Sequence, residues 1–153
     1  MALKPDRVEA YTDISFFCDT VSERGGIVSH VTGGSGVSMD DANAVVRYSA
    51  TDSGVIPAGL LLNDVVNIDL TRQHINWFKD EVQVGGKVVI LRQGQVTTDM
   101  LEAVAPTIGQ DAYCGVSGLL TNVVPVHNEA VKVGRFLSTK DADGYVKVDI
   151  NIT

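Results

Sequence analysis

Apolar and polar residues alternate with a period of two along much of the chain, as in strands that have one buried and one solvated face. The longest such part runs from Asp64 to Asp99. Its alternation predicts four strands: Asp64–Leu70, Asn76–Val84, Lys87–Arg92 and Gln95–Thr98. Two glycine-containing turns are expected to join the later strands, at Gly85-Gly86 and Gln93-Gly94. This part of the sequence therefore predicts a β-meander.

The same alternation recurs before the meander. It predicts strands over Val8–Asp19 and Ile27–Thr32, and the loop Glu23–Gly26 between them suggests an early hairpin. The segment Gly54–Gly59 is expected to lead into the meander, with Leu60–Leu62 buried directly after it.

After the meander, short apolar runs predict three further strands: Ala112–Val116, Leu119–Val126 and Lys132–Leu137. The clearest strand is the last one. It follows a turn at Asp141–Gly144, and every second residue from Val146 to Ile152 is a valine or isoleucine that is expected to point inward. Val148 should therefore be buried, while Lys147 should face solvent.

Signals for helix are few and short. Ser38–Asp41 has the Ser-x-x-Asp form of a helix start, and Asp99–Glu102 has a similar Asp-x-x-Glu form that ends before Pro106. Each predicts one or two helical turns. Met1–Arg7 has no periodic pattern and is expected to be an arm that becomes ordered only when it docks on another surface.

Composition supports the β interpretation. Valine is more than twice as frequent as leucine, and β-branched side chains lose less freedom in a strand than in a helix. The 153 residues, of which 44% are hydrophobic, suffice for one principal core. The predicted fold is mainly β: a compact β-barrel or β-tulip-like domain over 8–153, with an N-terminal arm over 1–7. A separate hairpin lobe over 8–50 is the alternative division.

Charge and hydropathy exclude several kinds of partner. The net charge of −7 and the scattered positions of the 12 Lys and Arg residues disfavour nucleic acid. No apolar run is long enough to predict a membrane span, and the N-terminal residues lack the apolar region of a secretory signal. Cys18 and Cys114 are expected to be two free, buried thiols, which fits synthesis in a reducing cytoplasm.

The sequence offers no convincing catalytic, cofactor-binding or metal-binding residues. Gly33–Gly36 lacks the spacing of a phosphate loop, and Ser35 and Ser117 do not complete the G-x-S-x-G motif of a serine nucleophile. The turn at Asp141–Gly144 lacks the remaining ligands of a calcium loop. The three histidines show no zinc spacing: His30, His74 and His127. We therefore predict a protein that is not an enzyme.

Some residues are instead candidates for contact with a partner. Phe16-Phe17 and Trp77-Phe78 place aromatic side chains on both faces of their strands, so at least one member of each pair cannot enter a single core. The arm contributes charged and rigid residues. The candidate contact residues are Lys4, Pro5, Arg7, Phe16, Phe17, Trp77 and Phe78.

Three parts of the chain carry a resemblance to a known family. They are Val55–Gly59 with Leu61–Gln73, Lys79–Gly94 with Val96–Thr98, and Lys132–Ser138 with Asp143–Val148. In these parts the chain resembles the small β-barrel decoration, or cement, proteins on the heads of tailed bacteriophages. The resemblance implies a structural virion protein that binds the major capsid protein from outside, often as a homotrimer, and stabilises the head. Its location would be the capsid surface.

Two other classes of function stay open at this point. The first is a carbohydrate- or receptor-binding β-module of a virion spike or tail. The second is an enzyme built on a trimeric barrel, because Gly54–Gly59 is similar to loops of trimeric nucleotide pyrophosphatases. The serine and aspartate motifs of those enzymes are not found elsewhere in the chain, and a shared fold does not carry the chemistry without its site.

Overall fold

The structure is a computed structural model that describes residues 3–20, 22–31, 44–50, 55–65, 68–69, 74–75, 81–82, 84–124 and 131–152. The described part is mainly β, which confirms the predicted fold class. Its helical content is a single 3-10 turn, η1 (Val116–Gly118). Within the described residues no helix is long and apolar enough to cross a bilayer.

The described residues form thirteen strands. In order they are β1 (Val8–Cys18), β2 (Ser22–Glu23), β3 (Ile27–His30), β4 (Val45–Arg47), β5 (Pro57–Asp64), β6 (Ile68–Asp69), β7 (His74–Ile75), β8 (Glu81–Val82), β9 (Lys87–Thr98), β10 (Asp111–Cys114), β11 (Leu120–Thr121), β12 (Lys132–Phe136) and β13 (Val146–Asn151). Nine of them join one sheet in the order β1-β4-β3-β5-β9-β13-β12-β10-β11, and β1 pairs in addition with β9.

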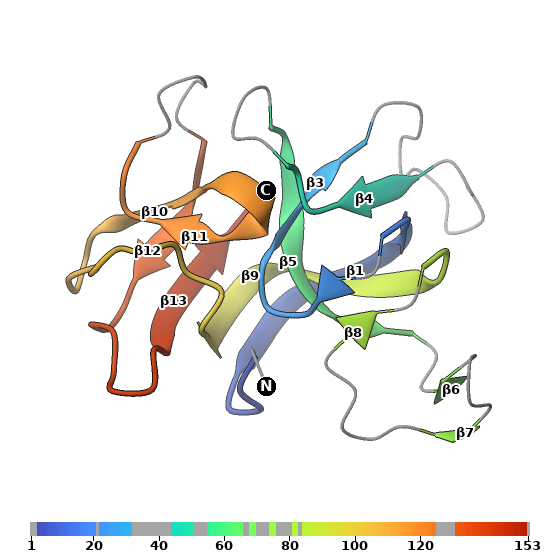
Figure 1. Cartoon of the computed structure of the whole chain (residues 1–153), viewed down its shortest axis with the longest axis horizontal. Coiled ribbons are helices and arrows are strands. Elements are labelled where there is room, and N and C mark those ends of the chain that lie inside the picture. Colours follow the sequence, from blue (N-terminus) through green and yellow to red (C-terminus); the bar gives the residue numbers. More distant parts are fainter. Residues whose placement is uncertain are drawn as a thin grey trace.

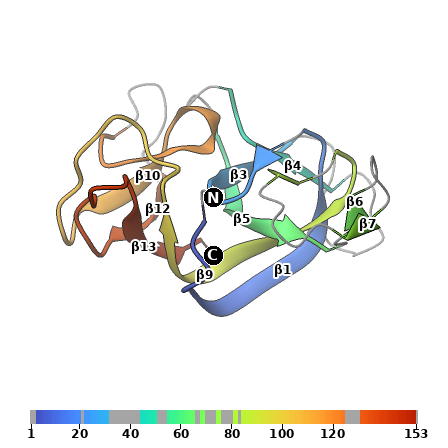
Figure 2. The same cartoon turned by 60° about the horizontal axis from the view of Figure 1, so that its bottom comes forward.

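The additional pairing closes half of this sheet into a ring of five strands, β1, β4, β3, β5 and β9 (Figure 2). Strand β1 runs antiparallel to β9 from the pair Phe17 and Lys87 to the pair Val8 and Gln95. The C-terminal end of β1, Phe17 and Cys18, also pairs with β4 in parallel, and this pairing closes the ring. In Figure 1 the ring occupies the side where β1, β3, β4 and β5 are labelled.

The other half is an open antiparallel sheet, β9-β13-β12-β10-β11, on the opposite side of the molecule in Figure 1. Its pairing with β9 is regular, with six successive partners from Val146 opposite Thr98 to Asn151 opposite Gln93. The long strand β9 therefore belongs to both halves: its first part pairs with β5 and its second part with β13.

Each half has its own hydrophobic core. The ring core consists of Phe16, Cys18, Val28, Ala44, Val46, Ala58, Leu61, Val82, Val88 and Ile90. The sheet core consists of Leu3, Ile27, Val55, Leu60, Leu62, Leu91, Val96, Ala112, Cys114, Leu120, Val133, Phe136, Val146, Val148, Ile150 and Ile152. Because side chains alternate along a strand, β5 supplies Leu61 to the ring core and its neighbours Leu60 and Leu62 to the sheet core.

Several predictions from the sequence are confirmed. Val148 is buried and Lys147 is exposed on β13, so the predicted register of the last strand is correct. Leu60–Leu62 is buried, and the chain turns at Asp141–Gly144. Asp141 fixes this turn because its Oδ1 accepts the backbone N–H groups of Asp143 and Tyr145, at 3.0 and 2.8 Å. Gly85 lies in the predicted turn before β9.

The predicted reversal at Gln93-Gly94 is wrong, because β9 runs through both residues without a turn. Gly94 has a different role. A Cβ atom there would lie 2.1 Å from the carbonyl oxygen of Val8, so only glycine lets β1 approach β9 this closely. The glycine that resembled a turn residue is therefore a strand residue at a close backbone contact.

The early hairpin is also wrong. Strand β3 pairs with β4 and β5, whereas β1 pairs with β4 and β9. The antiparallel partner of β1, β9, is almost 80 positions away along the chain, as in the pair Thr12 and Leu91. A separate hairpin lobe over 8–50 does not fit this arrangement, because β1 and β3 are built into the same ring as β5 and β9.

The predicted helix at Asp99–Glu102 is absent. Leu101 forms a parallel bridge with Leu120. The backbone N–H of Glu102 donates to the carbonyl oxygen of Leu120 at 2.9 Å, and that of Leu120 donates to Met100 at the same distance. Pairing with β11 thus satisfies the backbone groups that a helix would have satisfied internally. The other predicted helix, Ser38–Asp41, lies outside the described residues.

The N-terminal arm docks on its own chain from Leu3 onward. Leu3 is 1% exposed within the sheet core and forms a bridge with Thr98. The N–H of Lys4 donates to the carbonyl oxygen of Thr97 at 2.9 Å. The surface on which this arm docks is therefore its own domain, and Leu3 completes the sheet core.

Candidate functional site

The predicted contact residues divide into three groups in the structure. Phe16 is 2% exposed in the ring core, so it is not available to a partner, and that prediction is wrong. Its ring packs edge-on against His30, with 5.2 Å between the centroids. Phe17 is half-buried, and the Nζ atom of Lys87 lies 5.0 Å from the centre of its ring. Trp77 and Phe78 lie outside the described residues.

The three contact residues of the arm lie on the described segment before β1. Pro5 is exposed. Arg7 is half-buried and forms an ion pair with Glu9. The Nζ atom of Lys4 lies 4.3 Å from the centre of the Tyr145 ring, so this cation contacts its own chain.

A group of polar side chains lies where the ring meets the open sheet. The Nε atom of Arg92 is 3.3 Å from Oδ2 of Asp13, and each side chain is 21% exposed. Arg92 lies between the residues of β9 that pair with β5 and those that pair with β13, and its carbonyl oxygen accepts the N–H of Ile152. The register shifts between the pairs Tyr11–Gln93 and Thr12–Leu91, which leaves Arg92 with no directly opposite residue in β1. This irregularity lies next to Asp13 in the sequence of β1.

Hydrogen bonds and charge set the protonation of this group. Burial raises the pKa of Asp13, but hydrogen bonds from Ser15 and the charge of Arg92 outweigh it, so the net shift is downward. Asp13 is therefore ionised at neutral pH. Burial and the charge of Arg92 lower the pKa of His30, against the opposing effect of Asp13. His30 is accordingly neutral at neutral pH.

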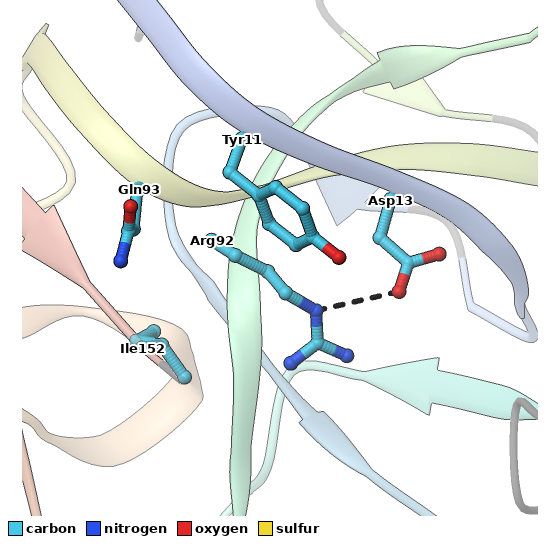
Figure 3. Close-up of a pocket in the computed structure, with 5 residues that line it drawn as sticks. All are labelled: Tyr11, Asp13, Arg92, Gln93 and Ile152. Carbon is cyan, nitrogen blue, oxygen red and sulfur yellow. Dashed lines mark hydrogen bonds and ion pairs between the residues drawn. The ribbon is translucent and has the colours of Figure 1, made fainter.

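These charged residues border an open depression of about 460 Å³, lined by Tyr11, Asp13, Arg92, Gln93 and Ile152. Figure 3 shows Tyr11 and Asp13 extending from β1 toward Arg92, with Gln93 and Ile152 on the other side. None of these five residues was predicted from the sequence to belong to a site. The one local signal was the i, i+2 spacing of Tyr11 and Asp13, which places their side chains on one face of a strand.

A second open depression, of about 530 Å³, lies beside β3 and β4 and includes Ser29, His30, Arg47 and Tyr48 in its lining. Arg47 is paired with Asp19 at its edge. The hydroxyl of Tyr48 donates to the carbonyl oxygen of Glu23 and accepts the N–H of Gly26, and burial raises the pKa of this phenol. The bonds of Tyr48 hold the β2–β3 turn in place, which is a structural role.

The described residues hold no cluster of three or more His, Cys, Asp or Glu side chains that could bind a metal. Cys18 and Cys114 are both buried and form no disulfide, as predicted. Of the histidines, His30 belongs to β3 and His74 to β7, whereas His127 lies outside the described residues.

The geometry thus presents a polar depression and an exposed strand, β1, next to it. The sequence matches no protein-family model, and a search of curated proteins finds no relative.

Proposed function

We propose that this chain is a structural virion protein that binds the outer surface of a phage capsid and stabilises the head. The observation that carries the proposal is the exposure of β1. From Val8 to Thr12 this strand is exposed on both of its faces, although its backbone is fixed to β9. Val8 is 59% exposed and Ile14 is 36% exposed. A rigid strand with uncovered apolar side chains is a surface suited to burial against another protein.

The pairing of β1 also indicates how a partner would be bound. Three irregularities interrupt its register with β9. Such bulges twist an edge and discourage uncontrolled strand addition. Contact through the side chains of Val8 and Ile14 is therefore favoured over extension of the sheet, and this suits a module that attaches to a folded capsid.

A capsid offers many identical binding positions, so a small interface per copy can be sufficient for attachment. If the protein binds as homotrimers at symmetric positions of the capsid, the three copies of each trimer bind together. Their weak individual contacts then add up to firm attachment. The proposal assigns no turnover to the protein. It rests on the exposed strand and on the sequence resemblance to decoration proteins described above.

Binding to empty, expanded heads of the phage that encodes the chain tests this function. The full-length protein should cosediment with the heads in a density gradient and raise the temperature at which they break open. The double substitution Val8→Asp with Ile14→Asp should reduce the bound fraction at least tenfold, because it places two carboxylates in an apolar contact. Both side chains are already exposed, so the isolated domain should keep its melting temperature.

A matched control uses two exposed apolar residues far from β1 in the sequence, Ile108→Asp with Val123→Asp. This variant should bind as the unmodified chain does. Equal losses from both double variants would show that β1 is not the contact surface. If the unmodified chain never binds heads, the capsid function is wrong.

Native mass spectrometry of the free protein gives the oligomeric state, which we expect to be a trimer.

A further inference from the structure

The free end of Arg92 gives the depression beside β1 a specific chemistry. Its Nε atom is bonded to Asp13, but within the described residues its two terminal amino groups donate no hydrogen bond to the protein. In Figure 3 these groups point away from the Asp13 carboxylate. Arg92 therefore presents a planar pair of donors to the depression, next to the acceptor oxygens of Asp13.

The charge of the depression favours a neutral ligand. Arg92 and Asp13 compensate each other, and the low pKa of Asp13 keeps the pair ionised at neutral pH. The chain as a whole carries a net charge of −7, which repels anions. A ligand with adjacent hydroxyl groups can accept from Arg92 and donate to Asp13 without adding charge.

The remaining walls supply apolar contact and one further polar group. The ring of Tyr11 is largely exposed, and Ile152 lies on the other side of the depression. The amide nitrogen of Gln93 donates to Oδ1 of Asn151 at 3.3 Å, which orients the amide and leaves its carbonyl oxygen as an acceptor. An aromatic ring, an oriented amide and an ion pair around one depression can contact both the apolar face and the hydroxyl edge of a sugar ring.

We propose that this depression is a binding site for a neutral hexopyranose unit, with Tyr11 stacked on the sugar ring and the Asp13–Arg92 pair bonded to two adjacent hydroxyls. Its volume of about 460 Å³ lies in the range of small-molecule sites. The site is largely formed in advance: β1 and β9 are paired on both sides of it, and Oδ1 of Asp13 is held by the N–H of Ser15 at 2.7 Å. Such preorganisation reduces the entropic cost of binding.

The site is independent of the capsid proposal, since it requires neither heads nor a trimer. The same site would equally suit the spike or tail module that was the alternative interpretation of the sequence.

Nuclear magnetic resonance titration of the full-length protein tests the site. The probes are the methyl glycosides of D-glucose, D-galactose, D-mannose and N-acetyl-D-glucosamine, with sodium acetate as the anionic comparison. At least one glycoside should move the amide signals of Tyr11, Asp13, Arg92 and Gln93 with a dissociation constant of order 1 mM. Acetate at the same concentration should move them far less.

Two variants locate the contact. Tyr11→Ala should weaken binding of that glycoside about tenfold, and Tyr11→Phe should retain it within about twofold, because stacking needs the ring and not the hydroxyl. Arg92→Lys should weaken binding about tenfold, since lysine lacks the planar pair of donors. Thr12→Ala, on an exposed neighbour in β1, is the control and should have no effect.

Three results would overturn the proposal. They are an absence of shifts with all four glycosides, acetate shifts that exceed the glycoside shifts, and unchanged glycoside binding in Tyr11→Ala. Amide spectra of each variant without ligand show whether it has folded.

Discussion

The ring and the open sheet share strand β9 but are built differently. In the open sheet, β13 follows β9 through six successive partners without interruption, and the sheet core includes Phe136 and several leucines and isoleucines. In the ring, β1 follows the same strand with three irregularities, and the ring core includes the small residues Cys18, Ala44 and Ala58. The two partners of β9 therefore differ in register: the pairing with β13 is continuous, whereas the pairing with β1 is interrupted at three points.

The difference shows where a β-domain can hold polar chemistry. A regular antiparallel strand directs every second side chain inward, so an inward charge would be costly. The register shifts of β1 lie on both sides of Asp13, and the change of partner along β9 places Arg92 at the boundary of the two halves. The polar depression therefore lies at the junction of the ring and the open sheet.

The largest expected effect tests the regularity of the sheet half. Val148→Asp should lower the free energy of unfolding by about 4 kcal/mol, because an unpaired carboxylate would have to be desolvated or protonated in the sheet core. Urea denaturation measures the change. Lys147→Asp, on the adjacent exposed position, should cost less than about 0.5 kcal/mol. Equal losses would show that the register of β13 is wrong.

The same variant also tests how tightly the two halves are coupled. Strands β5 and β9 contribute side chains to both cores, so the ring should unfold together with the sheet. Hydrogen exchange of Val148→Asp should show reduced protection in β3 and β13 alike. Protection retained in β3 alone would mean that the ring is a separate folding unit.

The second effect concerns the segment that leads from the sheet core into the ring. Leu3→Ala should lower the free energy of unfolding by about 2 to 4 kcal/mol, because Leu3 is buried and its truncation leaves a cavity. Pro5→Ala, at an exposed position two residues later, is the control and should change stability by less than about 0.5 kcal/mol. Denaturant midpoints that agree for the two variants would contradict the docking of the N-terminal segment.

The smallest effect concerns the polar end of the ring. The pKa of His30 lies below its ordinary value of 6.5, so the unfolded chain binds more protons there than the folded chain as pH falls through this range. His30 therefore contributes stability above about pH 6.5 that is lost as pH drops toward the folded pKa. His30→Gln should flatten this part of the pH profile of stability.

Proton resonances of the imidazole measure the His30 pKa directly, with the assignment made by comparison with His30→Gln. The groups that face it are Asp13, Arg92 and the ring of Phe16. Arg92→Gln should raise the pKa of His30, because it removes a nearby positive charge. A His30 pKa above 6.5 in the unmodified protein would contradict this electrostatic picture.

The sequence by itself determined the class of fold and much of the sheet half. The alternation from Val146 to Ile152 predicts which side chains of β13 are buried, because a strand with one covered face has an apolar side chain at every second residue. The turn at Asp141–Gly144 is equally local, since it depends on the Asp141 carboxylate and on the positive φ of 90° at Gly144.

Only the tertiary structure decided the ring and the polar depression. The pairing of β1 with β9 joins segments almost 80 positions apart, and the sequence of neither segment indicates which other strand it pairs with. Gly94 looked like a turn residue because a glycine at a close backbone contact and a glycine in a turn are identical in sequence. Tyr11 and Arg92 likewise gain their common site only when these strands meet, because side chains distant in the chain are brought together by packing alone.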